Sequence, residues 1–213
     1  PKPFATALFT LSSHHPYSIP KQHKGRFPKG SMIVHETVGY TDYALKKFFE
    51  QASKKDWFAN TLFIITADHS ALTSQEEFKT QLGLFRIPMI IYHPGIKTPL
   101  ISNQIMQQID IYPTIADLLH LDDDIFCFGR SAFSPLPHYY IYYTNGEYLL
   151  LIGDYLSKYK EDFSIELYNV KQDPHLQNDI SAKEPALAKK HKDFTEAIIQ
   201  QYNNSIISNK THN

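Results

Sequence analysis

The sequence predicts an α/β fold with a mainly parallel sheet, followed by a small antiparallel meander and a terminal helix. Two observations predict this fold. Short apolar runs alternate with amphipathic stretches up to about residue 121, and hairpin signals replace this alternation after residue 138. We therefore expect an α/β region over residues 1–135 and an antiparallel subdomain with the terminal helix over residues 136–213.

Three short apolar runs predict the buried strands of the first region, at residues 4–11, 60–67 and 87–92. Each run is apolar on both faces, as the strands of a covered parallel sheet are. Between the first two runs, apolar or small side chains recur every three or four residues from Val34 to Ala52, which predicts an amphipathic helix. A second helix is predicted over residues 110–121, flanking the sheet.

The second region carries a strong hairpin signal at Asn145-Gly146, between the apolar runs 139–144 and 147–153. This dipeptide readily supplies the positive φ angles of a type I′ turn. Further runs at 154–160 and 163–168 extend the hairpin into a meander.

The terminal helix is predicted to begin near Ser181 and Glu184, whose spacing is that of a capping box, with Pro185 directly after them. One face of this helix carries its larger apolar side chains and a histidine: Leu187, His191, Phe194, Ile198 and Tyr202.

Composition excludes several classes of protein. The chain of 213 residues is 42% hydrophobic and 20% charged, which is a globular balance. Its formal net charge of −1 gives no general attraction to nucleic acid, so no nucleic-acid partner is expected. The single cysteine, Cys127, excludes an internal disulfide and a cysteine zinc cluster. Its apolar neighbours indicate a packed thiol.

Asp68 and His69 are the first candidates for chemistry, because they directly follow an apolar strand. Ligands of open α/β sheets bind at the carboxyl ends of strands, and a carboxylate with an imidazole suits Zn²⁺ or Mn²⁺. The alternative is that Asp68 caps a turn and His69 is an ordinary surface residue.

His14 is the second candidate, in the polar segment that follows the first apolar run. A histidine there could hold a phosphate or sulfate oxygen, or give a proton to a leaving group. The alternative is an exposed loop. If parallel strands end on one side of the sheet, His14 and Asp68 lie within about 15 Å of each other. The basic loop formed by Lys21, Lys24, Arg26 and Lys29 is either a solvated surface or an attractor of an anionic head group.

Six stretches together resemble the C-terminal half of the sulfatase branch of the alkaline phosphatase superfamily. Within that branch they are similar to the lipoteichoic acid synthase and membrane phosphoglycerol transferase group. The stretches appear in the family's order, at residues 8–17, 39–45, 61–69, 87–95, 108–115 and 166–174. The resemblance implies an alkaline phosphatase-like fold.

The resemblance also implies roles for individual residues. Asp68 and His69 match two ligands of the family's catalytic metal, Mn²⁺ or Zn²⁺. His14 matches a histidine that contacts the substrate phosphate, and would orient or protonate the leaving oxygen as a catalytic residue. Thr73 lies near the position of a small hydroxyl residue that lines the same substrate pocket.

The family's nucleophile and remaining acidic ligand belong to its N-terminal half. Cys127 does not replace that nucleophile, since Cys127-Phe128-Gly129-Arg130 lacks the C-x-P-x-R pattern of formylglycine enzymes. We expect a longer protein, with this half and transmembrane helices preceding Pro1. The implied location is the extracytoplasmic face of a bacterial membrane.

The resemblance implies transfer of a phosphoglycerol-type head group from a lipid to an acceptor. The alternatives are a sulfatase or phosphodiesterase that hydrolyses a sulfate or phosphate ester, a phosphoethanolamine transferase, and a catalytically silent binding module. The upstream sequence discriminates among them. On its own, the present chain is expected to bind metal poorly and to have no turnover.

Overall fold

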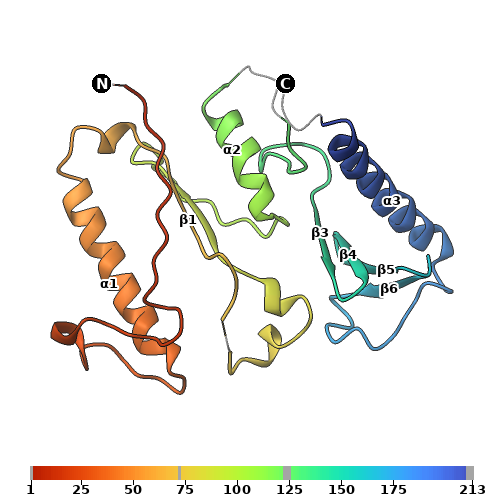
Figure 1. Cartoon of the computed structure of the whole chain (residues 1–213), viewed down its shortest axis with the longest axis horizontal. Coiled ribbons are helices and arrows are strands. Elements are labelled where there is room, and N and C mark those ends of the chain that lie inside the picture. Colours follow the sequence, from red (N-terminus) through yellow and green to blue (C-terminus); the bar gives the residue numbers. More distant parts are fainter. Residues whose placement is uncertain (1, 72, 122–125, 210–213) are drawn as a thin grey trace. The chain divides into compact units, whose positions relative to one another are not determined.

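The computed structural model describes residues 2–71, 73–121 and 126–209. The chain divides into two compact units, Pro1–Leu100 and Ile101–Asn213. The first unit contains helix α1 (Val34–Ala52) and strands β1 (Phe63–Thr66) and β2 (Met89–Tyr92), as Figure 1 shows. Its described residues also form four 3₁₀ helices: η1 (Lys21–His23), η2 (Phe58–Asn60), η3 (Glu76–Phe78) and η4 (Gly83–Phe85).

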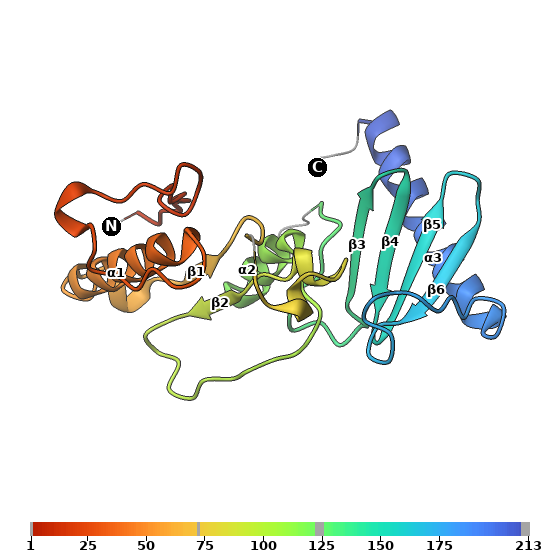
Figure 2. The same ribbon diagram turned by 90° about the horizontal axis from the view of Figure 1, so that it is seen from below.

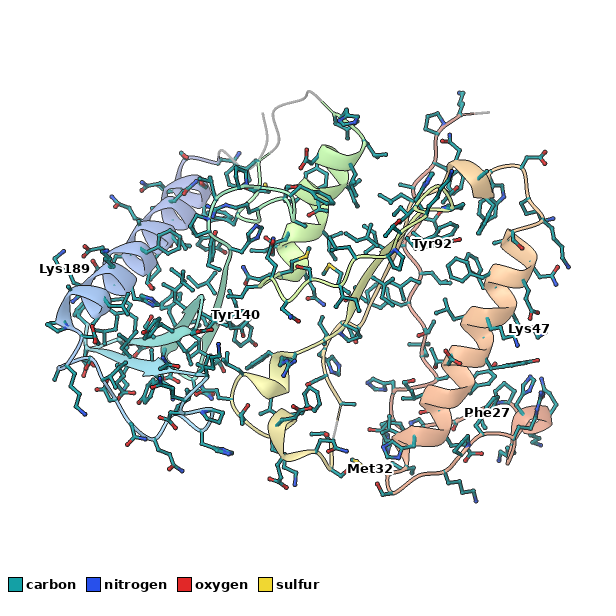
Figure 3. The ribbon with its side chains drawn as sticks, turned by 180° about the vertical axis from the view of Figure 1, so that it is seen from behind. Phe27, Met32, Lys47, Tyr92, Tyr140 and Lys189 are labelled. Atoms are coloured by element: carbon teal, nitrogen blue, oxygen red, sulfur yellow. The ribbon has the colours of Figure 1, made fainter. Side chains whose placement is uncertain are left out.

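Aromatic side chains hold α1 against the strands of the first unit. The ring of Phe49 on α1 lies 5.1 Å from the ring of Phe63 on β1 and 5.7 Å from that of Tyr92 on β2. Figure 3 labels Tyr92 on its strand. The Phe49–Tyr92 pair has edge-to-face geometry and the Phe49–Phe63 pair is tilted, and both contacts stabilise the packing of α1 against the strands. The predicted helix over residues 34–52 is confirmed.

The strands of the first unit pair in a direction that the sequence did not predict. β1 and β2 are antiparallel, with Phe63 opposite Tyr92 and Thr66 opposite Met89. Every strand pair within the described residues is antiparallel, so the expected parallel pairing is not formed there. A parallel pair needs a crossover connection, usually an α-helix, and the described residues between β1 and β2, 67–71 and 73–88, contain only the short 3₁₀ helices η3 and η4.

The apolar run at residues 4–11 is not a strand, which corrects the prediction of a first buried strand. It is extended and unpaired, and the side chains of Leu8 and Leu11 are about four-fifths exposed. A run that is apolar on both faces becomes a sheet strand only between neighbouring strands, in a sheet whose two faces are covered by other elements. In the described part of this unit the two strands, β1 and β2, pair with each other instead.

The second unit contains η5 (Gln108–Asp110), α2 (Ile111–Leu118), a four-stranded sheet and α3 (Pro185–Ile207). The strands β3 (Tyr139–Thr144), β4 (Glu147–Ile152), β5 (Tyr155–Lys160) and β6 (Ile165–Asn169) form an antiparallel meander in chain order. Asn145 and Gly146 have φ angles of 51° and 79°, which confirms the predicted hairpin turn. α2 belongs to the same compact unit as the meander, and the domain division expected near residue 135 stays a prediction.

α3 covers one face of the meander (Figure 2). Its buried His191 places Nδ1 3.1 Å from the hydroxyl of Ser157 on β5. The helix begins at Pro185, and the expected capping role of Ser181 is wrong, because the backbone N–H groups of Lys183 and Glu184 donate to the Ile180 carbonyl and no side chain caps the helix. Among the helices that the structure describes, none has the length and apolarity that a membrane span requires.

Candidate functional site

Asp68 and His69 follow the end of β1 after one intervening residue, Ala67, where the chain has left strand geometry. Their side chains are 63% and 73% exposed, and His69 Nε2 lies 3.7 Å from Asp68 Oδ2. The backbone N–H of His69 donates to Asp68 Oδ1 at 3.0 Å. The turn therefore brings the carboxylate and the imidazole of these adjacent residues to one side of the chain.

The His69 ring has a defined orientation. Its Nδ1 lies 2.6 Å from the carbonyl oxygen of Ser70, which can only accept, so Nδ1 carries the proton. In the neutral ring, Nε2 is then left with the lone pair that a metal ligand needs. Together with the Asp68 carboxylate, this nitrogen fits the donor set of Zn²⁺ or Mn²⁺.

The two side chains suit such an ion in chemistry but supply only two donors. Across residues 2–71, 73–121 and 126–209, no group of three or more His, Cys, Asp and Glu side chains is placed to hold a metal ion. The pair therefore fits part of a metal site.

Two hydroxyl groups fasten the segment around Asp68 to the chain that precedes β2. The Ser70 hydroxyl donates to the carbonyl of Leu84 in η4, and the Thr66 hydroxyl donates to the carbonyl of Pro88 at 2.9 Å. These contacts join residues 14 and 22 positions apart. They hold the turn that carries the two candidate ligands.

His14 lies in a tight turn of its own. Its backbone N–H donates to the Leu11 carbonyl, and its carbonyl accepts from Tyr17 at 2.7 Å. Its Nδ1 donates to the carbonyl of His15 at 2.8 Å, which again leaves Nε2 as the outward-facing nitrogen. The ring is exposed, so a ligand could reach it.

Ser13 anchors the His14 turn to α1. Its hydroxyl lies 3.1 Å from that of Thr41, and Thr41 already donates its proton to the carbonyl of Thr37. Ser13 is therefore the donor in this contact. The anchoring roles of Ser13 and Ser70 were not predicted from the sequence. Their only signal was their position next to a candidate histidine.

Thr73 is half-buried, and its hydroxyl oxygen accepts the backbone N–H of Gln75 at 3.0 Å. The hydroxyl proton remains available to another acceptor. The structure thus places Asp68 and His69 side by side, His14 in a turn against α1, and Thr73 in the segment before η3. The expected convergence of His14 and Asp68 within one site stays a prediction.

The Cys127 thiol lies 3.4 Å from the Gly129 carbonyl, and burial raises its pKa above the ordinary value. A thiol with a raised pKa is a poor nucleophile, as expected of a packed cysteine.

The basic loop packs on α1. The guanidinium of Arg26 lies 5.0 Å from the centre of the Tyr43 ring, and Phe27 lies against the same helix (Figure 3). Lys21, Lys24 and Lys29 remain exposed, so their charges face water.

Known proteins with similar sequences and folds place this chain in a family. A sequence model of the sulfatase family matches residues 1–121. The lipoteichoic acid synthase 2 of Bacillus subtilis is 24% identical over 220 residues, which cover 93% of this chain and 32% of that protein. The chain thus spans about a third of the length of this curated relative.

Two solved structures share the fold. A protein of the alkaline phosphatase superfamily from Vibrio parahaemolyticus superimposes with a TM-score of 0.73 at 24% identity, over 92% of this chain and 48% of that one. The lipoteichoic acid synthase LtaP from Listeria monocytogenes gives 0.71 at 22% identity, over 94% and 53%. The predicted α/β class and superfamily are thereby confirmed. With more than half of its residues matched by the family's sequence model, the chain belongs to the sulfatase family.

Proposed function

We propose that this chain is the C-terminal part of a metal-dependent enzyme that transfers a phosphoglycerol-type head group from a lipid to an acceptor. The reaction would take place at the extracytoplasmic face of a bacterial membrane. Family membership supports a hydrolase or a transferase, and the similarity to lipoteichoic acid synthases over nearly the whole chain favours transfer. The nucleophile, a further acidic ligand and the transmembrane helices would precede Pro1.

One structural observation carries the proposal. Both candidate histidines donate Nδ1–H to the carbonyl of the next residue, so both direct Nε2 away from the backbone. An imidazole fixed in this tautomer by a local carbonyl is suited to bind a metal or to exchange a proton with a substrate oxygen. His93 shows the opposite arrangement, because its Nδ1 accepts the N–H of Gly95.

Each residue would then have a distinct task. Asp68 and His69 would hold the divalent metal, which when bound supplies charge neutralisation and lowers the pKa of a nucleophile. In its doubly protonated form, His14 would donate Nε2–H to an oxygen of the phosphate group and pass this proton to the leaving oxygen, which returns the ring to the neutral Nδ1–H tautomer. The Thr73 hydroxyl would donate to a second oxygen of the same group.

Hydrolysis is the second candidate function. The match to the sulfatase family model favours hydrolysis, since sulfatases hydrolyse sulfate esters. A phosphodiesterase would use the same metal ligands, and so would a phosphoethanolamine transferase, which is a further alternative for transfer. The sequence encoded upstream of Pro1 discriminates among them. A threonine nucleophile after membrane helices supports transfer, and a cysteine in C-x-P-x-R supports sulfate ester hydrolysis.

Calorimetric titration of the 213-residue chain with Mn²⁺ and with Zn²⁺ tests the metal assignment. We expect weak binding, because Asp68 and His69 supply only two ligands and a stable site needs at least three. Asp68→Ala should abolish this weak binding, whereas Asp56→Ala, at another exposed aspartate of the same unit, should leave it unchanged. Micromolar binding by the chain, or metal-dependent turnover of a chromogenic phosphodiester, would contradict the proposal that the nucleophile and a further metal ligand precede Pro1.

The reaction is tested in the protein encoded by the complete gene, with phosphatidylglycerol labelled in its head group. We expect transfer of the label to an acceptor, and a loss of at least about a hundredfold in His14→Gln, the range for removing a general acid. Release of free glycerol phosphate without transfer would support the hydrolase instead.

A further inference from the structure

The second unit contains a groove that the proposed function does not use. Its volume is about 580 Å³, within the range of small-molecule sites. Three aromatic side chains line it: Tyr148 on β4, Tyr159 on β5, and Phe163 in the turn between β5 and β6. Figure 2 shows the C-terminal end of α3 beside this turn and the turn that joins β3 to β4.

Phe163 is an unusual residue for its position. Its φ is 65°, in the left-handed region that favours glycine or asparagine, and its side chain is 70% exposed. The backbone is held there because Phe163 N–H donates to the Lys160 carbonyl and Lys192 Nζ donates to the Phe163 carbonyl at 2.9 Å. An exposed phenyl ring on a strained backbone buries little surface and so contributes little to the stability of the fold. A role in binding explains its presence better.

The opposite wall of the groove carries side-chain amides. Gln200, Asn203 and Asn204 stand at helical spacings of three and four on α3, so they share one face. In the described part of the chain these three amides have no hydrogen-bond partner. Each offers both a donor and an acceptor to a bound molecule.

The charged groups around the groove are already paired. The Glu196 carboxylate accepts the Tyr159 hydroxyl at 2.6 Å and lies 3.9 Å from Lys192, and Lys160 forms an ion pair with Glu166. Glu161 accepts the hydroxyl of Tyr143 at 2.9 Å. Neither lysine is left to bind a phosphate or a sulfate, and both carboxylates already have donors. The groove is therefore suited to an uncharged ligand.

We propose that this groove binds a neutral carbohydrate, as one or two sugar units of a glycan chain. The ring of Phe163 and the half-buried ring of Tyr148 would stack on the apolar C–H face of a sugar, and Tyr159, only 6% exposed, would form the floor beneath it. The amides of Gln200, Asn203 and Asn204 would bond the sugar hydroxyls. None of His14, Asp68, His69 and Thr73 takes part. The inference is thus independent of the proposed function.

Saturation-transfer NMR of the 213-residue chain with maltotriose, cellotriose and chitotriose tests the proposal, with choline chloride as a cationic comparison. We expect transfer to at least one trisaccharide at millimolar concentration and none to choline. Phe163→Gly removes the ring and relieves the positive φ, so this variant should fold with an unchanged or higher melting temperature. Its affinity for the sugar should fall at least about fivefold, as for the loss of one aromatic contact.

Phe133→Ala removes another exposed ring of the same unit, one that does not line the groove, and should leave sugar binding unchanged. The double variant Asn203→Ala/Asn204→Ala on the exposed helix face should weaken binding by a similar factor to Phe163→Gly. Absence of transfer to all three sugars, preference for choline, or equal losses in Phe163→Gly and Phe133→Ala would each overturn the proposal.

Discussion

Replacement of Asp110 should show how the second unit is held together. This side chain is only 3% exposed, and its two carboxylate oxygens accept the backbone N–H groups of Gln107 at 2.8 Å and of Arg130 at 2.7 Å. The first bond caps η5 and the second ties it to a segment 20 residues later. Asp110 therefore links the start of α2 to the chain that leads into β3.

The expected loss follows from the two donors that would be left without an acceptor. A buried hydrogen bond to a charged group contributes about 1.5–3 kcal/mol. Asp110→Ala removes both bonds and should cost about 3–6 kcal/mol, whereas Asp110→Asn keeps one acceptor oxygen and should cost about half as much. For a chain of this size, each kcal/mol lowers the melting temperature by about 2–4 °C.

Guanidinium unfolding followed by circular dichroism measures the loss, and hydrogen exchange of the amides of Gln107 and Arg130 locates it. Asp154→Ala is the matched control, because Asp154 is exposed in the same unit and its carboxylate forms a 3.8 Å surface ion pair with Lys171. Its effect should stay below about 1 kcal/mol. A loss below about 1 kcal/mol in Asp110→Ala, or unchanged exchange at both amides, would refute the linking role of Asp110.

Two further predictions concern the same unit. Gly129→Ala should unfold it or lower its melting temperature far more than Gly153→Ala, since a Cβ at Gly129 would lie 2.0 Å from the Ile109 carbonyl oxygen whereas Gly153 faces open space. Thermal unfolding of both variants measures the two effects. Gly153→Ala should cost about 1 kcal/mol, because Gly153 has a positive φ of 57°. Equal losses of stability in the two variants would contradict the steric clash at Gly129. Burial lowers the pKa of His191 in the folded chain, so the unfolded chain binds a proton more readily and stability should fall as the pH drops through about 6.5. Denaturant unfolding from pH 7.5 to 5.5 should show a shallower decline in His191→Gln than in the parent chain and in the exposed-residue control His175→Gln.

Local sequence patterns predicted the helix and the hairpin turn, whose geometry depends on residues close together in the chain. The spacing of apolar residues from Val34 to Ala52 gave α1 with its observed bounds, and Asn145-Gly146 adopts the turn that its residue types favour. Strand direction is different, because periodicity indicates an extended segment without specifying its partner. The run at residues 4–11 has strong strand character and stays unpaired, since pairing depends on the strands around it. Ser181 does not cap the helix, because the helix begins at Pro185 and the N–H groups of Lys183 and Glu184 already donate to the Ile180 carbonyl.

The candidate site separates into a part that local sequence encodes and a part that only the fold supplies. The tautomers of His14 and His69 depend on the carbonyl of the very next residue, so any chain that makes these turns would direct the same nitrogen outward. The positions of the turns depend instead on Ser13 reaching Thr41 on α1 and on Ser70 reaching the Leu84 carbonyl in η4. Loss of either hydroxyl should therefore leave the chemistry of the imidazole intact while releasing the turn that carries it. Because a phosphate or metal site depends on distances of a few tenths of an ångström, these two serines would act as positioning residues of the proposed enzyme.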